Sequence, residues 1–243
     1  MIDRLSPTRR PDQRVRGYQK WRSLLFLHWS LPVEAVQRLL PPGLSVDTFE
    51  GRAFVGVIPF TMRGVRPRFA PAVAPVSNFH ELNVRTYVHH EGRDPGIWFF
   101  SLEAANSLAV RLARRFWHLP YQRARMSMET QGNEVRYASE RLWPGPLPAR
   151  FRARWRTGEE LGTAQPGTFE HFLVERYILY ADLGPRGLRL GRVHHHPYLL
   201  RKAELLELDQ DLLAPAGLPP VEGAPHVLHS PGVDVEVFGL QRV

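Results

Sequence analysis

Polar and apolar side chains alternate along residues 78–90, so that one set is polar or charged and the other is mainly apolar. Glu81, Asn83 and Arg85 fall on one face of a β-strand, because successive side chains of a strand point to opposite faces. The other face is formed by Leu82, Val84, Thr86 and Val88. Burying charged groups in such a setting is costly unless they are paired. The segment therefore predicts a β-sheet protein with a buried polar cluster, either a structural ion-pair network or a functional site.

A second strand-like segment, IWFFSLE, follows the turn EGRDPG. Its polar residues Ser101 and Glu103 share a face with Ile97 and Phe99. If the two segments form a hairpin with an even-sum register, both polar sets lie on one side, and Arg85 lies close to Ser101 or Glu103. A slip of one residue would place the two sets on opposite faces.

The composition favours one mostly β domain. The 22 prolines and 19 glycines are scattered along 243 residues, as expected for many short strands joined by turns. We expect a mobile arm over residues 1–17 and a single domain over 18–243. The absence of cysteine excludes disulfides. No apolar run reaches the ~18 residues of a membrane span, and the N-terminus lacks the apolar stretch of a secretory signal, so we expect a cytoplasmic protein without membrane contact.

Two further segments flank the polar cluster. Residues 64–77 form a proline-rich loop, which is either a lid over a pocket or a surface connection. Residues 106–117 have the spacing of a helix, with Leu108, Leu112 and Phe116 in one apolar stripe, and Pro120 follows.

The chain resembles the YqjF-like family of uncharacterised conserved proteins. The resemblance is carried by FLHWSLP, LLPPGLSVDTFEGRAFVGVIPF, the segments between residues 78 and 121, GTFEHFLVERYILY and VHHHPYLLRKAEL. That family is distantly similar to acetoacetate decarboxylase. The resemblance implies a closed, mostly antiparallel β-barrel with a few peripheral helices, a small-molecule cavity inside it, and a possible homo-oligomer.

The distant similarity can be carried over at a few positions. Glu81 matches a pocket glutamate of the decarboxylases, and Arg114, Trp117 and Pro120 match their arginine–tryptophan–proline pattern. The next residue in the decarboxylases is the Schiff-base lysine, and here it is Tyr121. A phenol cannot form an imine, so the resemblance supports the fold and the cavity but not the decarboxylase mechanism. The chain's two lysines, Lys20 and Lys202, lie outside this segment.

These arguments give a set of candidate site residues. The candidates for catalysis are Glu81, Glu103 and Tyr121. The candidates for ligand binding are Arg85, Ser101, Arg114, Asn83 and His28. For each, a structural role remains open: an ion-pair network for the charged residues, a packed tyrosine or histidine, and an exposed Arg114 or one paired with Glu103.

Metal and cofactor chemistry lack support in the sequence. His194 and His196 would share a face of a strand beside His195, but no third ligand stands at a recognisable spacing, so we predict no metal site. There is no P-loop, dinucleotide-binding fingerprint or nucleophile elbow, and we predict no cofactor.

Three functions remain open. The first is a small-molecule enzyme, such as a lyase, that uses no Schiff-base lysine. The second is a non-catalytic module that binds a small acidic or apolar metabolite in the same cavity. The third, nucleic-acid binding, rests on a net charge of +8, but the arginines are spread along the chain and no nucleic-acid-binding motif is present, so it ranks last.

Overall fold

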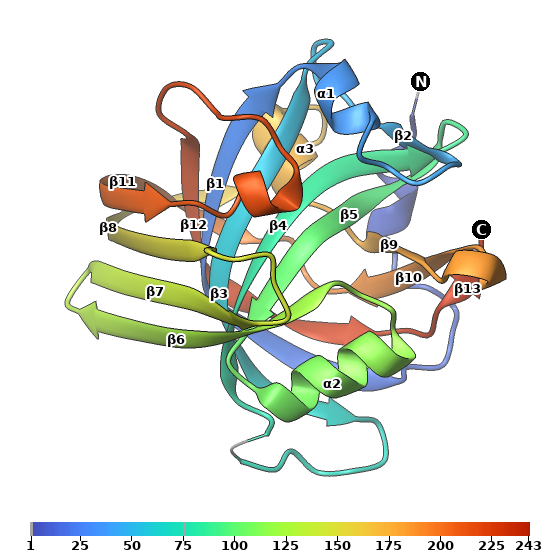
Figure 1. Ribbon diagram of the computed structural model, residues 1–243, viewed down its shortest axis with the longest axis horizontal. Coiled ribbons are helices and arrows are strands. Elements are labelled where there is room, and N and C mark those ends of the chain that lie inside the picture. Colours follow the sequence, from blue (N-terminus) through green and yellow to red (C-terminus); the bar gives the residue numbers. More distant parts are fainter. Residues whose placement is uncertain (1, 75) are drawn as a thin grey trace.

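The computed structural model describes residues 2–74 and 76–243, and in these residues one sheet of 13 strands dominates the fold (Figure 1). The strands are β1 Gly17–Leu31, β2 Leu44–Val46, β3 Ala53–Pro67, β4 Phe79–His90, β5 Arg93–Ala104, β6 Tyr121–Gln131, β7 Glu134–Trp143, β8 Arg150–Thr163, β9 Ile178–Asp182, β10 Leu188–His194, β11 Leu199–Gln210, β12 His226–Val237 and β13 Gln241–Arg242. The α-helices are α1 Val33–Gln37, α2 Ser107–Phe116 and α3 Phe169–Val174, and short 3-10 helices span Ser6–Thr8, Gly184–Arg186 and Ala214–Ala216. The predicted mostly β class with a few helices is confirmed.

The strands follow one continuous order, and two further pairings connect strands that are distant in it. Neighbouring strands run in the order β13-β10-β9-β5-β6-β7-β8-β11-β12-β1-β3-β4-β2, and β5 also pairs with β4. A further pairing joins β10 to β12. Most pairs are antiparallel, as expected, but β5 runs parallel to both β6 and β9. The connection from β5 to β6 runs through α2, which allows two successive strands to be parallel.

The central strands β1, β3 and β4 are buried on both faces. One face contributes Phe26 and Tyr87 to a core that we call the aromatic core. The other face contributes Leu27 and Val84 to a second core that contains Trp155. In β3 the run AFVGVIPF is buried throughout, because its β-branched and aromatic residues serve both cores. The polar face of β4 belongs to the side of the aromatic core, since Glu81, Asn83 and Arg85 alternate with the second-core residues.

A bulge in β5 decides on which face the polar residues of this strand lie. Arg85 pairs with Phe99, as an even-sum register requires, but Val84 pairs with Ser101, so Phe100 is an extra residue in β5. Beyond the bulge the alternation is inverted, and Glu103 pairs with Leu82. Of the two alternatives considered from the sequence, the one that places Ser101 and Glu103 on the face opposite Arg85 is therefore observed. They lie on the face of the second core, because one inserted residue exchanges the two faces of all residues after it.

Helix α2 lies where the sequence predicts it. The side chain of Asn106 caps its N-terminus by accepting hydrogen bonds from the backbone N–H groups of Leu108 and Ala109, both at 3.0 Å. Leu108 and Leu112, two members of the predicted apolar stripe, are 47% and 46% exposed. The side chain of Phe116, the third member, lies outside the described part of the structure.

The N-terminal residues contact the domain. The Arg4 guanidinium forms an ion pair with Asp47, a fully buried residue that also binds Arg176 at 2.7 Å. The backbone N–H of Arg16 donates to the carbonyl of Val237 at 2.8 Å. The mobility of this arm stays a prediction. No helix in residues 2–74 and 76–243 has the length and apolar character needed to span a bilayer.

Candidate active site

Glu81 and Tyr121 form a buried carboxyl–phenol pair. The Tyr121 hydroxyl donates to Glu81 Oε2 at 3.0 Å, and Glu81 is 3% exposed. In the described residues no basic side chain forms an ion pair with Glu81. Burial therefore raises the pKa of Glu81 to about 8, against the smaller lowering effect of the hydrogen bond from Tyr121. At neutral pH the carboxyl group holds its proton, which it can donate to or recover from a ligand.

The end of α2 fixes the position of Tyr121. Arg114, in the last turn of the helix, donates from Nη1 to the backbone carbonyl of Tyr121 at 2.7 Å. Its guanidinium lies 5.5 Å from the centroid of the Trp143 ring. On the other side, β6 begins at Tyr121 in parallel register with Leu102 of β5. Binding of a ligand carboxylate by Arg114 stays a prediction, and the hydrogen bond that this arginine makes holds Tyr121 in place.

Arg85 is a buried cation without a counter-ion in the described residues. It is 7% exposed, and Nη2 donates to the carbonyl of Leu173 at 3.2 Å. Its Nε has no hydrogen-bond partner. The rings of Phe26 and Tyr87 lie 5.9 and 5.8 Å from its guanidinium carbon. A guanidinium keeps its charge even when buried, so an unpaired one is a strong binding group for a carboxylate.

His28 lies in the same row as Arg85, two strands away. Gly56 of β3 pairs with both residues, and a Cβ atom at Gly56 would lie 3.0 Å from the His28 ring. The hydroxyl of Tyr87 donates to the carbonyl of Leu173 at 2.7 Å, so at 2.6 Å it accepts a hydrogen bond from His28 Nε2. His28 Nδ1 is then an unprotonated acceptor, and it has no partner. Burial lowers the pKa of His28 well below its usual value, which keeps the ring neutral.

The remaining candidates separate into two groups. Asn83 lies between Glu81 and Arg85 on the same face of β4, is 5% exposed, and its Oδ1 has no partner. Ser101, on the other face, is 3% exposed and its hydroxyl also lacks a partner. Glu103 forms a two-pronged ion pair with Arg141, with Nε donating to Oε2 at 3.1 Å, and both side chains are at most 1% exposed. This arrangement is that of a structural pair.

Sequence reasoning missed a group of residues beside the arginine. His195 is 3% exposed, and its ring stacks on Tyr177 with centroids 4.5 Å apart. Its Nδ1 donates to the carbonyl of His196, which leaves Nε2 as a second buried acceptor without a partner. Burial lowers the pKa of His195 to about 4. The Tyr177 hydroxyl donates to Glu175, whose other oxygen accepts from the backbone of Tyr198 at 2.9 Å.

A sequence signal for this group existed. Glu175 and Tyr177 come from LVERYILY, and His195 and Tyr198 come from VHHHPYLLR, two of the stretches that carry the family resemblance. In the sequence, the run His194–His196 is typical of a metal-binding motif, and the run alone does not indicate that one of its members lies in the interior. His195 turns inward while His196 is exposed, and the described residues contain no group of three His, Asp or Glu side chains placed to hold a metal.

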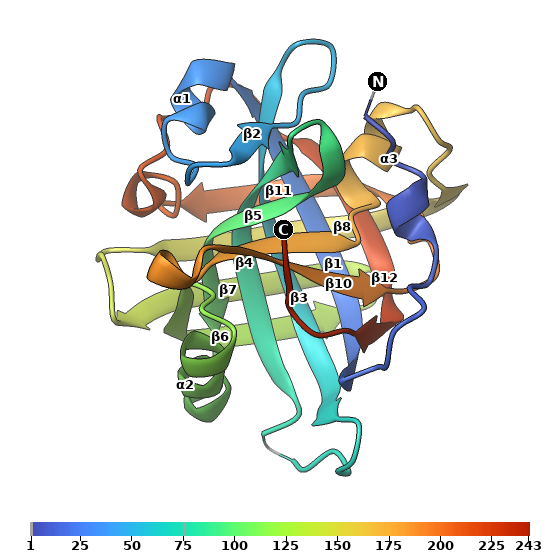
Figure 2. The same cartoon turned by 90° about the vertical axis from the view of Figure 1, so that its right-hand side faces the viewer.

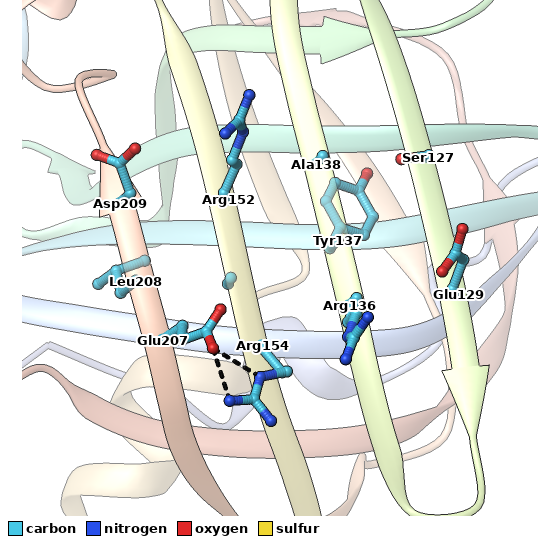
Figure 3. A pocket seen from close by; sticks show the side chains of 11 residues that line it. Ser127, Glu129, Arg136, Tyr137, Ala138, Arg152, Arg154, Glu207, Leu208 and Asp209 are labelled. Carbon is cyan, nitrogen blue, oxygen red and sulfur yellow. Dashed lines mark hydrogen bonds and ion pairs between the residues drawn. The ribbon is translucent and has the colours of Figure 1, made fainter.

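A surface groove lies elsewhere, on the outer face of β6, β7, β8 and β11 (Figure 3). Its volume is about 630 Å³, and its lining residues include Ser127, Arg136, Ala138, Arg152, Arg154 and Glu207. Tyr137 of β7 lies between this groove and the interior: the residue contributes to the groove lining, but its side chain belongs to the second core and its hydroxyl donates to the backbone carbonyl of Glu81 at 2.8 Å. The groove and the Glu81–Tyr121 pair therefore lie on opposite sides of the sheet.

Comparison with known proteins places the chain in a family. The DUF2071 family, described as an uncharacterised conserved protein, matches residues 18–234. The chain belongs to this family. This chain is 40% identical to the uncharacterised protein YqjF of Bacillus subtilis (strain 168) over 186 residues, which are 76% of this chain and 75% of YqjF.

Solved structures share the fold of this DUF2071 protein at low identity. The enduracididine biosynthesis enzyme MppR, complexed with pyruvate, superposes with a TM-score of 0.64 at 16% identity, covering 95% of this chain and 91% of MppR. Acetoacetate decarboxylase from Legionella pneumophila gives a TM-score of 0.64 at 14% identity, with 98% and 94% covered. The acetoacetate decarboxylase-like fold expected from the sequence is confirmed, and at these identities the similarity concerns the fold alone.

Proposed function

We propose that this protein binds a small organic acid in the aromatic core and exchanges protons with it through Glu81. One observation carries the proposal: an unpaired buried arginine and a buried carboxyl–phenol pair lie on the same face of one strand. Arg85 and Glu81 are four residues apart, about 13 Å along a strand. The pairings that lead from β5 back to β4 support a closed barrel around this site.

Each interior residue has a role in this proposal. Arg85 binds the carboxylate, and the free acceptors of His28 and His195 receive hydrogen bonds from a hydroxyl group of the ligand or from water. Glu81 exchanges the proton, and Tyr121 orients Glu81. A small organic acid also agrees with the pyruvate bound in the MppR complex. An imine cannot form at position 121 of this chain, because this residue is a tyrosine rather than a lysine. Both lysines are exposed, with Lys20 paired to Asp234 and Lys202 to Glu159.

Arg85→Met is expected to weaken acid binding strongly without unfolding the protein. Losing a two-pronged charged contact weakens binding about a hundredfold. Because the arginine is buried without a counter-ion, its removal is expected to leave the melting temperature unchanged or raise it. Calorimetric titration with pyruvate as the first probe, and with methyl pyruvate as the uncharged control, measures the binding. A purely structural Arg85 would give the reverse result, with unchanged binding and a lower melting temperature.

Proton exchange is expected to depend on Glu81 and on pH. In D₂O, proton NMR follows the loss of the methyl signal of pyruvate as deuterium replaces hydrogen. Since the carboxylate form of Glu81 is the base, and burial raises the pKa of Glu81 to about 8, the exchange rate at low substrate should rise with pH and level off above about pH 8. Glu81→Gln is expected to bind pyruvate but to exchange at the background rate.

A Glu81→Gln protein with full exchange activity would refute the assignment of Glu81. Binding without exchange by the wild-type protein would instead support the non-catalytic ligand-binding function. The two outcomes are distinguishable because binding and exchange are measured on the same samples.

A further inference from the structure

Three segments meet at one end of the molecule, which we call the α2 end: residues 68–74 and 76–78 after β3, helix α2, and residues 142–149, which comprise the end of β7 and its connection to β8. The Asn106 side chain that caps α2 also donates to the carbonyl of Val76 at 2.9 Å. At the other end of the helix, Arg114 lies over the ring of Trp143. Helix α2 and the connection after β3 lie at the same end in two perpendicular views (Figures 1 and 2).

The α2 end exposes an unusual amount of apolar surface. Ten large hydrophobic side chains are exposed in the described part of the chain, and seven of them come from these three segments. They are Phe69, Val73, Leu108, Leu112, Leu142, Trp143 and Leu147, with exposed fractions from 37% to 77%. Single exposed leucines are common on protein surfaces, but a group of this kind marks an interaction surface.

The charge of the α2 end has one sign. Residues 63–78, 105–128 and 141–150 contain ten arginines and no aspartate or glutamate. Three of the ten are paired with carboxylates from other segments: Arg125 with Glu140, Arg141 with Glu103, and Arg150 with Asp211. Since the three segments contain no acidic residue of their own, they carry a net positive charge beside the exposed leucines and the exposed tryptophan.

We propose that the α2 end docks on an anionic lipid surface. Arginines attract the headgroups, while the leucines and Trp143 enter the boundary between headgroups and acyl chains, as in helices that lie in a membrane interface. A second copy of the chain fits poorly, because arginines would face arginines. Nucleic acid would pair with the arginines but would leave the aliphatic side chains without apolar contacts. Docking of this kind needs no spanning helix.

Vesicle sedimentation tests the proposal with the full-length protein. We expect binding to vesicles of phosphatidylcholine and phosphatidylglycerol (7:3) at low salt, and none to phosphatidylcholine alone. The double variant Leu108→Ser/Leu112→Ser should bind about a hundredfold more weakly, since each buried leucine contributes roughly tenfold or more. Arg111→Glu, which reverses one exposed charge on α2, should bind about thirtyfold more weakly.

Matched variants away from the α2 end serve as controls. Leu161→Ser alters a leucine of β8 that is 46% exposed, as Leu112 is, and Arg152→Glu reverses an exposed arginine on the outer face of the same strand. Both should bind vesicles like the wild type, and circular dichroism confirms that every variant is folded. Equal binding to both vesicle types, or equal loss in the test and control variants, overturns the proposal. The proposal is also overturned if the protein retards a 30-base-pair DNA duplex in a gel but does not bind vesicles. That result would identify a nucleic-acid-binding surface.

Discussion

Replacing Arg141 with methionine is expected to lower the free energy of unfolding by about 3–5 kcal/mol. Arg141 and Glu103 are at most 1% exposed and are held together by two hydrogen bonds. Without the arginine, the Glu103 carboxylate remains in the second core without a cation. Urea denaturation at pH 7, followed by tryptophan fluorescence, measures the loss.

A double variant separates the ion pair from its surroundings. Glu103→Leu combined with Arg141→Met removes both charges, and it should recover most of the lost stability, because replacing a whole buried ion pair by apolar groups is often neutral. Arg125→Met, which removes the exposed partner of Glu140, is the surface control and should cost at most about 1 kcal/mol. If Arg141→Met is no more destabilising than this control, the pair is not the structural element that its burial indicates.

Replacing Glu81 with glutamine is expected to stabilise the protein at alkaline pH. Burial raises the folded-state pKa of Glu81 to about 8, above its ordinary value of 4.5. Between these two pH values, Glu81 is protonated in the folded state but ionised in the unfolded state. The stabilising contribution of Glu81 is therefore complete below about pH 4.5 and is lost as the pH rises through 8. Glutamine stays neutral at every pH. The variant should therefore match the wild type at pH 4.5 and exceed it by up to about 5 kcal/mol at pH 9.

Denaturation midpoints of both proteins across this pH range test the expectation. The difference between wild type and variant isolates Glu81 from the other titrating groups. Glu222→Gln, a change at an exposed glutamate, should follow the wild-type curve throughout. A difference that stays constant from pH 4.5 to pH 9 would show that Glu81 does not titrate in this range. Such a result would also remove the basis for a proton-exchanging carboxyl group.

Local pattern was enough to predict the sheet class and half of the candidate site. The alternation in β4 correctly assigned Glu81, Asn83 and Arg85 to one face, because a two-residue period is a property of any strand. The pairing of Glu81 with Tyr121 was accessible through the family resemblance, since both positions match the pocket of the decarboxylases. The hydrogen bond between them joins residues 40 positions apart, a contact that no local pattern contains.

The bulge and the interior histidines were not predictable in the same way. Phe100 carries no glycine or proline signal, and its apolar ring packs into the second core as an ordinary strand residue would. The sequence does not distinguish His195 from the histidines on either side of it. Its side chain is buried because of the path that the chain takes between β10 and β11. Both features depend on which strands become neighbours, and this is decided by packing over the whole sheet.

The extra residue in β5 has a consequence for comparing relatives. Glu81 and Glu103 stand 22 positions apart in the sequence, and a single-residue insertion decides that one faces the aromatic core while the other meets Arg141. A relative that lacks one residue near Phe100 would present its second carboxylate to the interior, even with every other side chain unchanged. Sequence identity at position 103 therefore says little about chemistry unless strand length is matched as well. In this fold, the length of β5 determines how many acidic side chains face the aromatic core.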